Sequence, residues 1–306
     1  MNTDWFLIVN PTSGNGKSKK NWQHISTLLK SHGIRFSFAF TEYSKHESAL
    51  VQHAINNGFT KIISVGGDGT LHHIVNGIMS QKIVETTTIQ LAVIPIGTGN
   101  DWVKTYNIPA NIEKSILIIK KGTAVLQDIG KLTTENSGSV YFNNVAGIGY
   151  DGYVVNKLKK LKKFGGIAYL LSGIYGLLFY KKSKFKIEIN NQILEEKCLM
   201  TIFGICKFSG GGMQFTKEVH PSDGLLDITI AKNLTLIDLI LNLPKLYNGN
   251  IVHHKKVTTY KTDFIKVTPT STFEKPFIQA DGELIDSGSV TVSILENALQ
   301  FIVPSI

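Results

Sequence analysis

The sequence is short of several features that define whole classes of protein. Only two cysteines, Cys198 and Cys206, occur in 306 residues, and their spacing fits no metal-ligand pattern. They give no disulfide framework, so we expect both to be buried thiols of a protein from a reducing compartment. The N-terminus lacks the basic flank and the small-residue cleavage site of a signal peptide, so secretion is not expected.

Acidic residues are fewer than basic ones. The chain has 32 Lys and Arg residues against 23 Asp and Glu residues, which gives a formal net charge of +9. Such an excess favours an anionic partner, and nucleotides, nucleic acids and acidic membranes all qualify. Charge alone does not choose among the three.

Long uncharged runs are also scarce, and residues 164–180 form the stretch that raises the question of a membrane span. Its length is about the minimum that a span requires. Four glycines weaken it as a helix, namely Gly165, Gly166, Gly173 and Gly176. We therefore expect a helix buried against a soluble domain, with a membrane span as the alternative.

The first third of the chain alternates between short apolar runs and helical patterns. Strands are predicted at residues 5–9, 36–41, 61–65 and 91–94, with helices at 18–31, 45–56 and 70–80 between them. This βαβαβαβ order predicts a doubly wound parallel sheet with crossover helices.

From residue 127 onward the pattern changes to short β-type runs. They lie at residues 140–143, 186–189, 199–203, 226–230, 264–267, 277–279 and 290–294, with helical interruptions at 153–180 and 235–248. So many strands predict a sandwich or barrel. The expected organisation is an α/β domain at 1–127, rejoined by 300–306, and a β-sandwich domain at 128–299.

Polar turns follow the predicted strands of the first domain, at residues 10–17, 41–42, 66–70 and 95–101. Ligands of open parallel sheets bind at this edge. Three of the turns are rich in Gly, Ser, Thr and Asn, which let backbone amides approach an anion and supply hydroxyl groups. One such turn is equally explained as a tight connection, but three together favour a nucleotide-phosphate site.

Two common nucleotide motifs do not account for these turns. Residues 16–18 look like the end of a Walker A loop, but Pro11 stands where its first glycine belongs. The turns at 67–69 and 97–99 each begin like a dinucleotide fingerprint, yet His72 and Trp102 occupy the position of its third glycine.

What the turns do resemble is the catalytic domain shared by diacylglycerol, sphingosine and ceramide kinases. The similarity is carried by residues 10–14 (Asn-Pro-Thr-Ser-Gly), 66–70 (Gly-Gly-Asp-Gly-Thr) and 97–101 (Gly-Thr-Gly-Asn-Asp). It continues in order through residues 147–152, 210–213, 221–227 and 281–283. The resemblance, closest to the bacterial diacylglycerol kinases, implies an α/β nucleotide domain, a β-sandwich and an active site in the cleft between them.

The same resemblance implies ATP and Mg²⁺ as cofactors and assigns residues to them. The residues implied for ATP are Asn10, Pro11, Thr12, Ser13, Gly14, Thr41, Gly66, Gly67, Asp68, Gly69, Thr70, Leu71, His72 and Thr98. Asp68, Asp101 and Asp128 are implied to form an acidic network that reaches the magnesium, partly through water, so that Asp68 serves catalysis. Hard Mg²⁺ prefers such oxygen ligands, although capping or turn formation is the alternative for Asp101 and Asp128.

Two further sites are implied in the second domain. Asp281 or Glu283 would accept the proton from the lipid hydroxyl, unless residues 281–283 are a simple hairpin turn. A structural magnesium would be held around His220, Asp223 and Leu225, where Ser222, Asp223 and Gly224 are equally typical of a plain turn.

A basic, amphipathic stretch suggests where a lipid surface is met. Lysines at 157, 159, 160, 162 and 163 alternate with Val154, Leu158 and Leu161 at helical spacing. A solvated lysine face whose apolar side packs on the sandwich is an equal alternative.

The predicted function is therefore that of a cytoplasmic, membrane-associated kinase that phosphorylates a lipid hydroxyl, with diacylglycerol as the expected acceptor and no nucleic acid as partner. The sequence does not decide whether the chain forms a homodimer. The rival hypotheses are a soluble NAD kinase, which shares the turn at 66–70, and an inactive membrane-binding protein that retains a nucleotide fold.

Overall fold

The computed structural model describes residues 2–158, 173, 176–216, 218–271, 273 and 275–305. The chain divides into two compact units. The first unit comprises Met1–Asp128 and Asn297–Ile306, and the second comprises Ile129–Glu296. The chain passes from the first unit to the second within β5 (Thr123–Thr134) and returns to the first unit within β16 (Val290–Val303).

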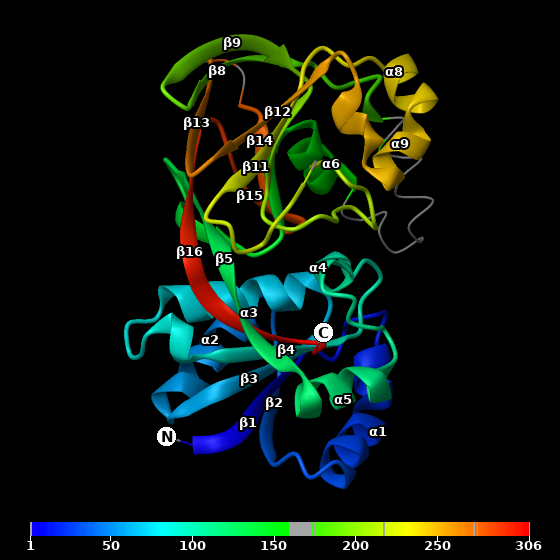
Figure 1. Ribbon diagram of the computed structural model, residues 1–306, viewed down its shortest axis with the longest axis vertical. Coiled ribbons are helices and arrows are strands. Elements are labelled where there is room, and N and C mark those ends of the chain that lie inside the picture. The colour runs from blue at the N-terminus through cyan, green and yellow to red at the C-terminus, as the bar shows by residue number, and fades with distance from the viewer. Residues whose placement is uncertain are drawn as a thin grey trace. The chain divides into compact units, whose positions relative to one another are not determined.

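The first unit is built on a parallel sheet with the strand order β2-β1-β3-β4-β16 (Figure 1). Its strands are β1 (Asn2–Val9), β2 (Phe36–Phe40), β3 (Phe59–Gly66), β4 (Gln90–Pro95) and the last part of β16. Its helices are α1 (Lys17–Ser31), α2 (His46–Asn56), α3 (Asp68–Ser80), the short α4 (Asp101–Thr105), α5 (Ile112–Lys121) and the 3₁₀ turn η1 (Thr86–Thr88).

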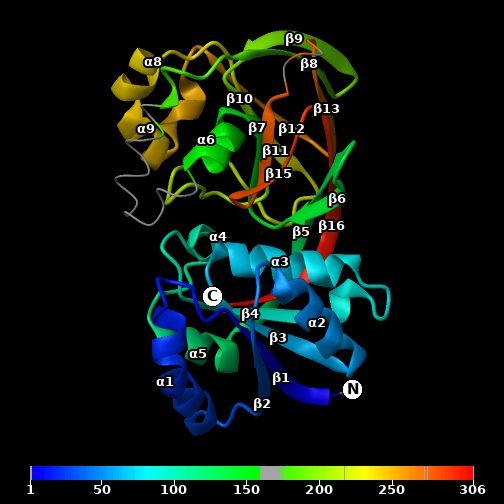
Figure 2. The same ribbon diagram turned by 180° about the vertical axis from the view of Figure 1, so that it is seen from behind.

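Both faces of this sheet are covered, which explains why its strands are nearly continuous apolar runs. Leu7 and Val9 of β1 pack with Ile25 of α1 and Ile116 of α5 on one face. Helices α2 and α3 pack together on the other face, as Figure 2 shows from behind. The predicted doubly wound α/β fold is confirmed.

The second unit contains an antiparallel sheet with the strand order β12-β11-β10-β7-β14-β15. These strands are β7 (Val145–Gly149), β10 (Met200–Gly204), β11 (Leu226–Ala231), β12 (Val257–Thr262), β14 (Phe277–Ala280) and β15 (Glu283–Ser287). A second antiparallel layer has the strand order β16-β13-β8-β9, in which β13 is Phe264–Pro269, β8 is Ser183–Ile189 and β9 is Gln192–Cys198. Strand β6 (Gly138–Phe142) pairs with β5. The predicted sandwich is thus confirmed.

Helices of the second unit differ in part from the predictions. The helix expected at 235–248 is two short helices, α8 (Leu236–Leu241) and α9 (Leu243–Asn248), with the 3₁₀ turn η3 (Asn250–His253) after them. The break falls at Asn242, because Pro244 in the first turn of α9 has no N–H to continue the preceding helix. The helix expected at 153–180 begins as α6 (Tyr150–Leu158), and most of its remainder lies outside the described residues.

No helix among the described residues is long and apolar enough to cross a membrane. Residues 159–172, 174 and 175, which hold most of the apolar stretch considered above, are outside that description.

The C-terminal strand belongs to the core of the first unit. Phe301 is fully buried, its ring lies 4.6 Å from that of Trp102, and β16 pairs with β4 at this point. The backbone N–H of Asn297 donates to the buried carboxylate of Asp128 at 2.7 Å, which fastens β16 to β5 where both leave the unit.

We predict that Phe301→Ala destabilises the first unit by about 3 to 5 kcal/mol, because it leaves a cavity in a core that cannot collapse around it. Urea denaturation measures the loss. Phe273→Ala is the matched control, since that ring is 96% exposed and its removal should cost less than about 0.5 kcal/mol. Equal effects of the two substitutions would contradict the role given to the C-terminal strand.

Candidate functional site

The polar turns of the first unit meet at one edge of the parallel sheet, as their sequence order predicts. The ladder of backbone hydrogen bonds continues past the strands: Asn10 N donates to Val65 O at 3.1 Å and Thr41 N to Val9 O at 2.9 Å. Ile96 N likewise donates to Gly66 O at 2.7 Å. The ends of β1, β2, β3 and β4 are therefore held in register.

Side chains of the first and third turns form one hydrogen-bonded group. Asn10 Nδ2 donates to Thr70 Oγ1 and to Glu47 Oε1, both at 3.1 Å, and Ser13 Oγ lies 3.4 Å from Thr70 Oγ1. Asn10 Oδ1 in turn accepts from the hydroxyl of Thr12 at 2.8 Å. Asn10 thus links the turn after β1 to the first turns of α2 and α3.

Glycines allow the third and fourth turns to touch. A Cβ atom on Gly97 would lie 2.7 Å from Gly67 Cα and 2.4 Å from Asn100 Oδ1, so any side chain there would collide with the neighbouring backbone. A Cβ atom on Gly67 would lie 3.1 Å from Gly97 Cα. Bare backbone at the start of α3 is the surface on which a helix N-terminus binds phosphate groups.

Asp68 joins the same two turns through its carboxylate. Its Oδ1 and Oδ2 accept from Asp101 N at 2.9 and 3.1 Å, and Oδ1 also accepts from Trp102 N at 3.3 Å. Asp101 Oδ1 pairs with Lys104 Nζ at 2.6 Å. A Cβ atom on Gly99 would lie 3.1 Å from Asp68 Oδ2 and 3.8 Å from Asp101 Oδ2, so an oxygen of each acid is directed to this point.

The other predicted nucleotide residues fall into two groups. Pro11, Gly14, Gly69 and Thr98 are at least partly open to solvent in the turns, whereas Thr41, Gly66, Leu71 and His72 are buried. His72 lies in α3 with its Nε2 3.4 Å from Asn76 Nδ2. The buried members support the turns from inside, while the open members present backbone and hydroxyl groups.

The acidic network is only partly assembled. Asp68 and Asp101 are adjacent, whereas Asp128 is buried on β5 and bonds to Asn297. Within the described parts of the chain, no group of three or more His, Cys, Asp and Glu residues is placed to hold a metal ion. Two carboxylates that reach magnesium through water are compatible with this geometry, and their role stays a prediction.

In the second unit, residues 281–282 do form a tight hairpin turn between β14 and β15. Asp281 and Gly282 both have positive φ, 50° and 79°. The carboxylate of Asp281 accepts from the backbone N–H groups of Asn143, Asn144 and Val145, at 3.2, 3.0 and 3.2 Å. Asp281 therefore fastens the turn to the start of β7, and Glu283 follows as the first residue of β15.

A buried relay supports this turn from below. Gln279 Nε2 donates to Asp151 Oδ2 at 2.9 Å, and Gln279 Oε1 accepts from Gly282 N at 2.9 Å. Burial raises the pKa of Asp151 to about 6, and the bond from Gln279 opposes that rise. The carboxylate fixes which end of the amide faces the turn, because only the NH₂ end of Gln279 can donate to it.

At the predicted structural metal loop, Asp223 already has a cationic partner. Its Oδ2 pairs with Lys261 Nζ at 2.6 Å, and its Oδ1 accepts from Leu225 N at 3.1 Å. Lys261 Nζ also lies 3.6 Å from Asp227 Oδ2. A divalent ion at His220, Asp223 and Leu225 would have to displace this ammonium group. The arrangement of these side chains therefore does not fit that ion. Metal binding at this loop stays an untested prediction.

Sequence reasoning missed several residues that build these sites. Glu47 was not predicted as a site residue, because it lies within the helical pattern of α2 and not at the end of a strand. Asp151 and Gln279 stand in or beside recognised motifs, but only tertiary structure shows that they contact each other. Of the lysines in the predicted basic stretch, only Lys157 lies within the described residues, and lysines 159, 160, 162 and 163 lie outside them.

Comparison with known proteins assigns both halves of the chain. Residues 4–132 match the family described as diacylglycerol kinase catalytic domain, and residues 144–303 match the YegS C-terminal NAD kinase beta sandwich-like domain. The diacylglycerol kinase of Staphylococcus carnosus is 27% identical over 279 residues, covering 90% of this chain and 87% of the relative. That of Bacillus subtilis is 28% identical over 284 residues, covering 90% and 88%. A crystal structure of a diacylglycerol kinase from Bacillus anthracis shares the fold, with a TM-score of 0.72 at 22% identity over 98% of this chain and 96% of the other.

We predict that Asp151 makes the second unit less stable as the pH rises from 4 to 7. The pKa of its folded carboxyl, about 6, lies above the ordinary value of 3.8, so only the folded state keeps its proton between these values. That contribution is fully present below pH 4 and is lost above pH 6. Relative to the parent, Asp151→Asn should gain about 2 to 3 kcal/mol of unfolding free energy between pH 4 and 7, measured by denaturation. Parallel pH curves for the two proteins would contradict the assignment.

Proposed function

The chain belongs to the bacterial diacylglycerol kinase family, and from this premise we propose that it transfers the γ-phosphoryl group of ATP to diacylglycerol, giving phosphatidic acid and ADP. It is a lipid kinase by its family. The observation that carries the proposal of ATP as donor is the close approach of Gly67 to Gly97, where bare backbone at the start of α3 adjoins the hydroxyl groups of Ser13 and Thr70.

We assign nucleotide binding to the first unit. The N–H groups at the start of α3 and in the turn after β1 would bind phosphate oxygens, since unsatisfied helix N-termini favour anions. Bound Mg²⁺ would neutralise charge that develops on the transferred phosphoryl group. Asp68 and Asp101 would orient waters around it, because an oxygen of each is directed to the space beside Gly99.

We assign proton transfer in the second unit to Glu283, with Asp281 as the positioning residue. Asp281 accepts three backbone hydrogen bonds, which occupy most of the acceptor sites of its carboxylate. Glu283 would accept the hydroxyl proton as the lipid oxygen forms its bond to the γ-phosphorus. The bond from that phosphorus to the β-phosphate oxygen breaks, and ADP leaves.

A second candidate acceptor is NAD, which the description of the matching sandwich family favours. The two candidates differ in the phosphorylated hydroxyl, on a glycerol backbone or on an adenosine ribose. We place the protein in the cytoplasm at the membrane, in agreement with its net positive charge and its two buried cysteine thiols.

The direct test is ADP release by the purified protein with Mg²⁺, ATP and mixed micelles that contain diacylglycerol. Turnover should depend on the lipid, and NAD should not replace it. A panel of sphingoid bases, phosphatidylglycerol and polyprenols separates diacylglycerol from other lipid hydroxyls. No stimulation by any lipid would overturn the lipid assignment, and NADP formation would support the second candidate. Asp68→Ala should abolish turnover, whereas an inactive membrane-binding protein would be unchanged by it.

We predict different defects for the two acids of the hairpin turn. Glu283→Gln should lower kcat by about 10² to 10⁴ with unchanged affinity for MgATP, because it removes a general base alone. Asp281→Asn should lower the unfolding free energy by about 1 to 3 kcal/mol, since an amide cannot accept all three backbone bonds. Steady-state kinetics and urea denaturation of both variants separate these effects. Full activity of Glu283→Gln would exclude it as the base.

A further inference from the structure

Helix α8 is apolar on both faces. Leu239 is buried, and Leu236 packs against the same cluster of Tyr150, Leu177 and Leu199. The opposite stripe, Ile237, Ile240 and Leu241, follows the i, i+3, i+4 spacing of one helix face, and its side chains are 68%, 51% and 74% exposed. A helix of a globular domain normally exposes polar residues on that side.

A second segment adds to this exposed surface. Leu178 and Phe179, in the turn after Gly176, are 59% and 64% exposed, while their neighbours Leu177 and Tyr180 pack in the cluster beneath α8. Lys182 Nζ donates to Asn233 Oδ1 at 2.8 Å. This bond joins the segment after the 178–179 turn to the loop that precedes α8. Tyr247 on α9 is also 40% exposed. These six residues, Leu178, Phe179, Ile237, Ile240, Leu241 and Tyr247, are called the apolar ridge below.

In the segments that carry the apolar ridge, lysines outnumber acids, although Lys232 pairs with Glu196 of β9. Residues 232–256 contain four lysines and a single acid, Asp238, and residues 176–183 contain two lysines and no acid. Lys256 Nζ pairs with Asp238 at 2.5 Å, and this bond holds the pKa of Asp238 well below its usual range. The positive charge of Lys256 and Lys197 also lowers the pKa of Lys182, after the larger effect of burial.

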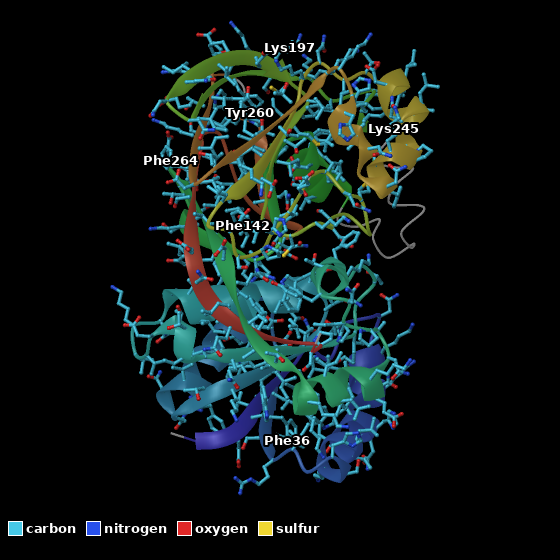
Figure 3. All side chains as sticks on the ribbon, in the orientation of Figure 1. Phe36, Phe142, Lys197, Lys245, Tyr260 and Phe264 are labelled. Carbon is cyan, nitrogen blue, oxygen red and sulfur yellow. The ribbon has the colours of Figure 1, made fainter. Side chains whose placement is uncertain are left out.

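The remaining lysines include exposed ones beside the ridge. Lys181 lies two residues after Phe179, and Lys245 is an exposed residue of α9 (Figure 3). Helices α8 and α9 lie next to each other at the periphery of the second unit in both ribbon views (Figures 1 and 2). Apolar side chains rimmed by lysines are the pattern of a surface that enters the headgroup region of an anionic bilayer.

We propose that the apolar ridge is the surface by which this protein docks on an anionic lipid bilayer. The ridge inserts its aliphatic and aromatic side chains among the lipid chains, and Lys181 and Lys245 bind the anionic headgroups. The proposal rests on the proposed function in one respect, because a kinase of bilayer lipids gains from residence at the surface that holds its acceptor. It does not use the basic stretch at residues 157–163.

The test measures binding to vesicles by flotation, without ATP or diacylglycerol, so that it is independent of catalysis. The parent should bind vesicles that contain phosphatidylglycerol and bind pure phosphatidylcholine more weakly. The triple variant Ile237→Ser, Ile240→Ser, Leu241→Ser should lose about tenfold or more in partition coefficient. Lys245→Gln should cost about fivefold on phosphatidylglycerol vesicles only, the equivalent of about 1 kcal/mol per lysine.

Matched controls separate docking from loss of fold. Ile193→Ser on β9 and Ile83→Ser in the first unit remove side chains that are 63% and 51% exposed, and both should bind vesicles like the parent. Ile240→Trp should bind at least as well as the parent, because tryptophan favours the bilayer interface. Unchanged binding by the triple variant, equal losses in the Ile193 control, or absence of parent binding would each overturn the proposal.

Activity keeps this proposal distinct from the proposed function. The triple variant should phosphorylate a short-chain diacylglycerol in detergent at the parental rate and lose activity on vesicles. If the parent lacks lipid kinase activity but binds vesicles through the ridge, docking stands and the proposed function falls. If the triple variant loses both activities equally while vesicle binding is unchanged, the ridge serves catalysis and docking is overturned. Salt-sensitive capture of nucleic acid in place of vesicles would also overturn it.

Discussion

The contact between Gly67 and Gly97 is the constraint on which the first unit depends. Two turns approach within a distance that admits no side chain, and this closeness brings Asp68 to the N-terminus of α4. The parallel sheet makes the approach feasible, because β3 and β4 are neighbours and end side by side. In the proposed phosphate site, backbone N–H groups would make most of the contacts, so glycine positions would determine its specificity more than charged groups do.

In the second unit, the main constraint is the position of Asp281 at the hairpin turn between β14 and β15. Asp281 is used as a fastener, and Gln279 orients the turn from below with the help of Asp151. Burial of a carboxyl group costs stability near neutral pH, which the raised pKa of Asp151 expresses. Asp151 thus orients Gln279 at a cost in stability near neutral pH.

How much the sequence predicts depends on how local the signal is. The alternation of apolar runs and helical patterns was enough for the α/β sheet, whose predicted strands match β1 to β4 within two or three residues. Strands β5, β7, β9, β12 and β15 were not predicted. In β9, β12 and β15 hardly any residue is fully buried, so alternation between buried and exposed residues is weak in these strands. Asp281 and Glu283 could not be told apart in sequence, because the bonds that engage Asp281 come from residues 143–145, far away along the chain.

The path of β16 has a consequence for how the molecule is made. Residues 297–303 complete the sheet of the first unit, although about 170 residues of the second unit separate them from β4 and β5. During synthesis from the N-terminus, the nascent first unit emerges from the ribosome without its fifth strand and keeps an open edge at β4. The second unit also needs β16, because β13 pairs with its residues 290–293. Both halves of the protein therefore depend on one strand near the C-terminal end.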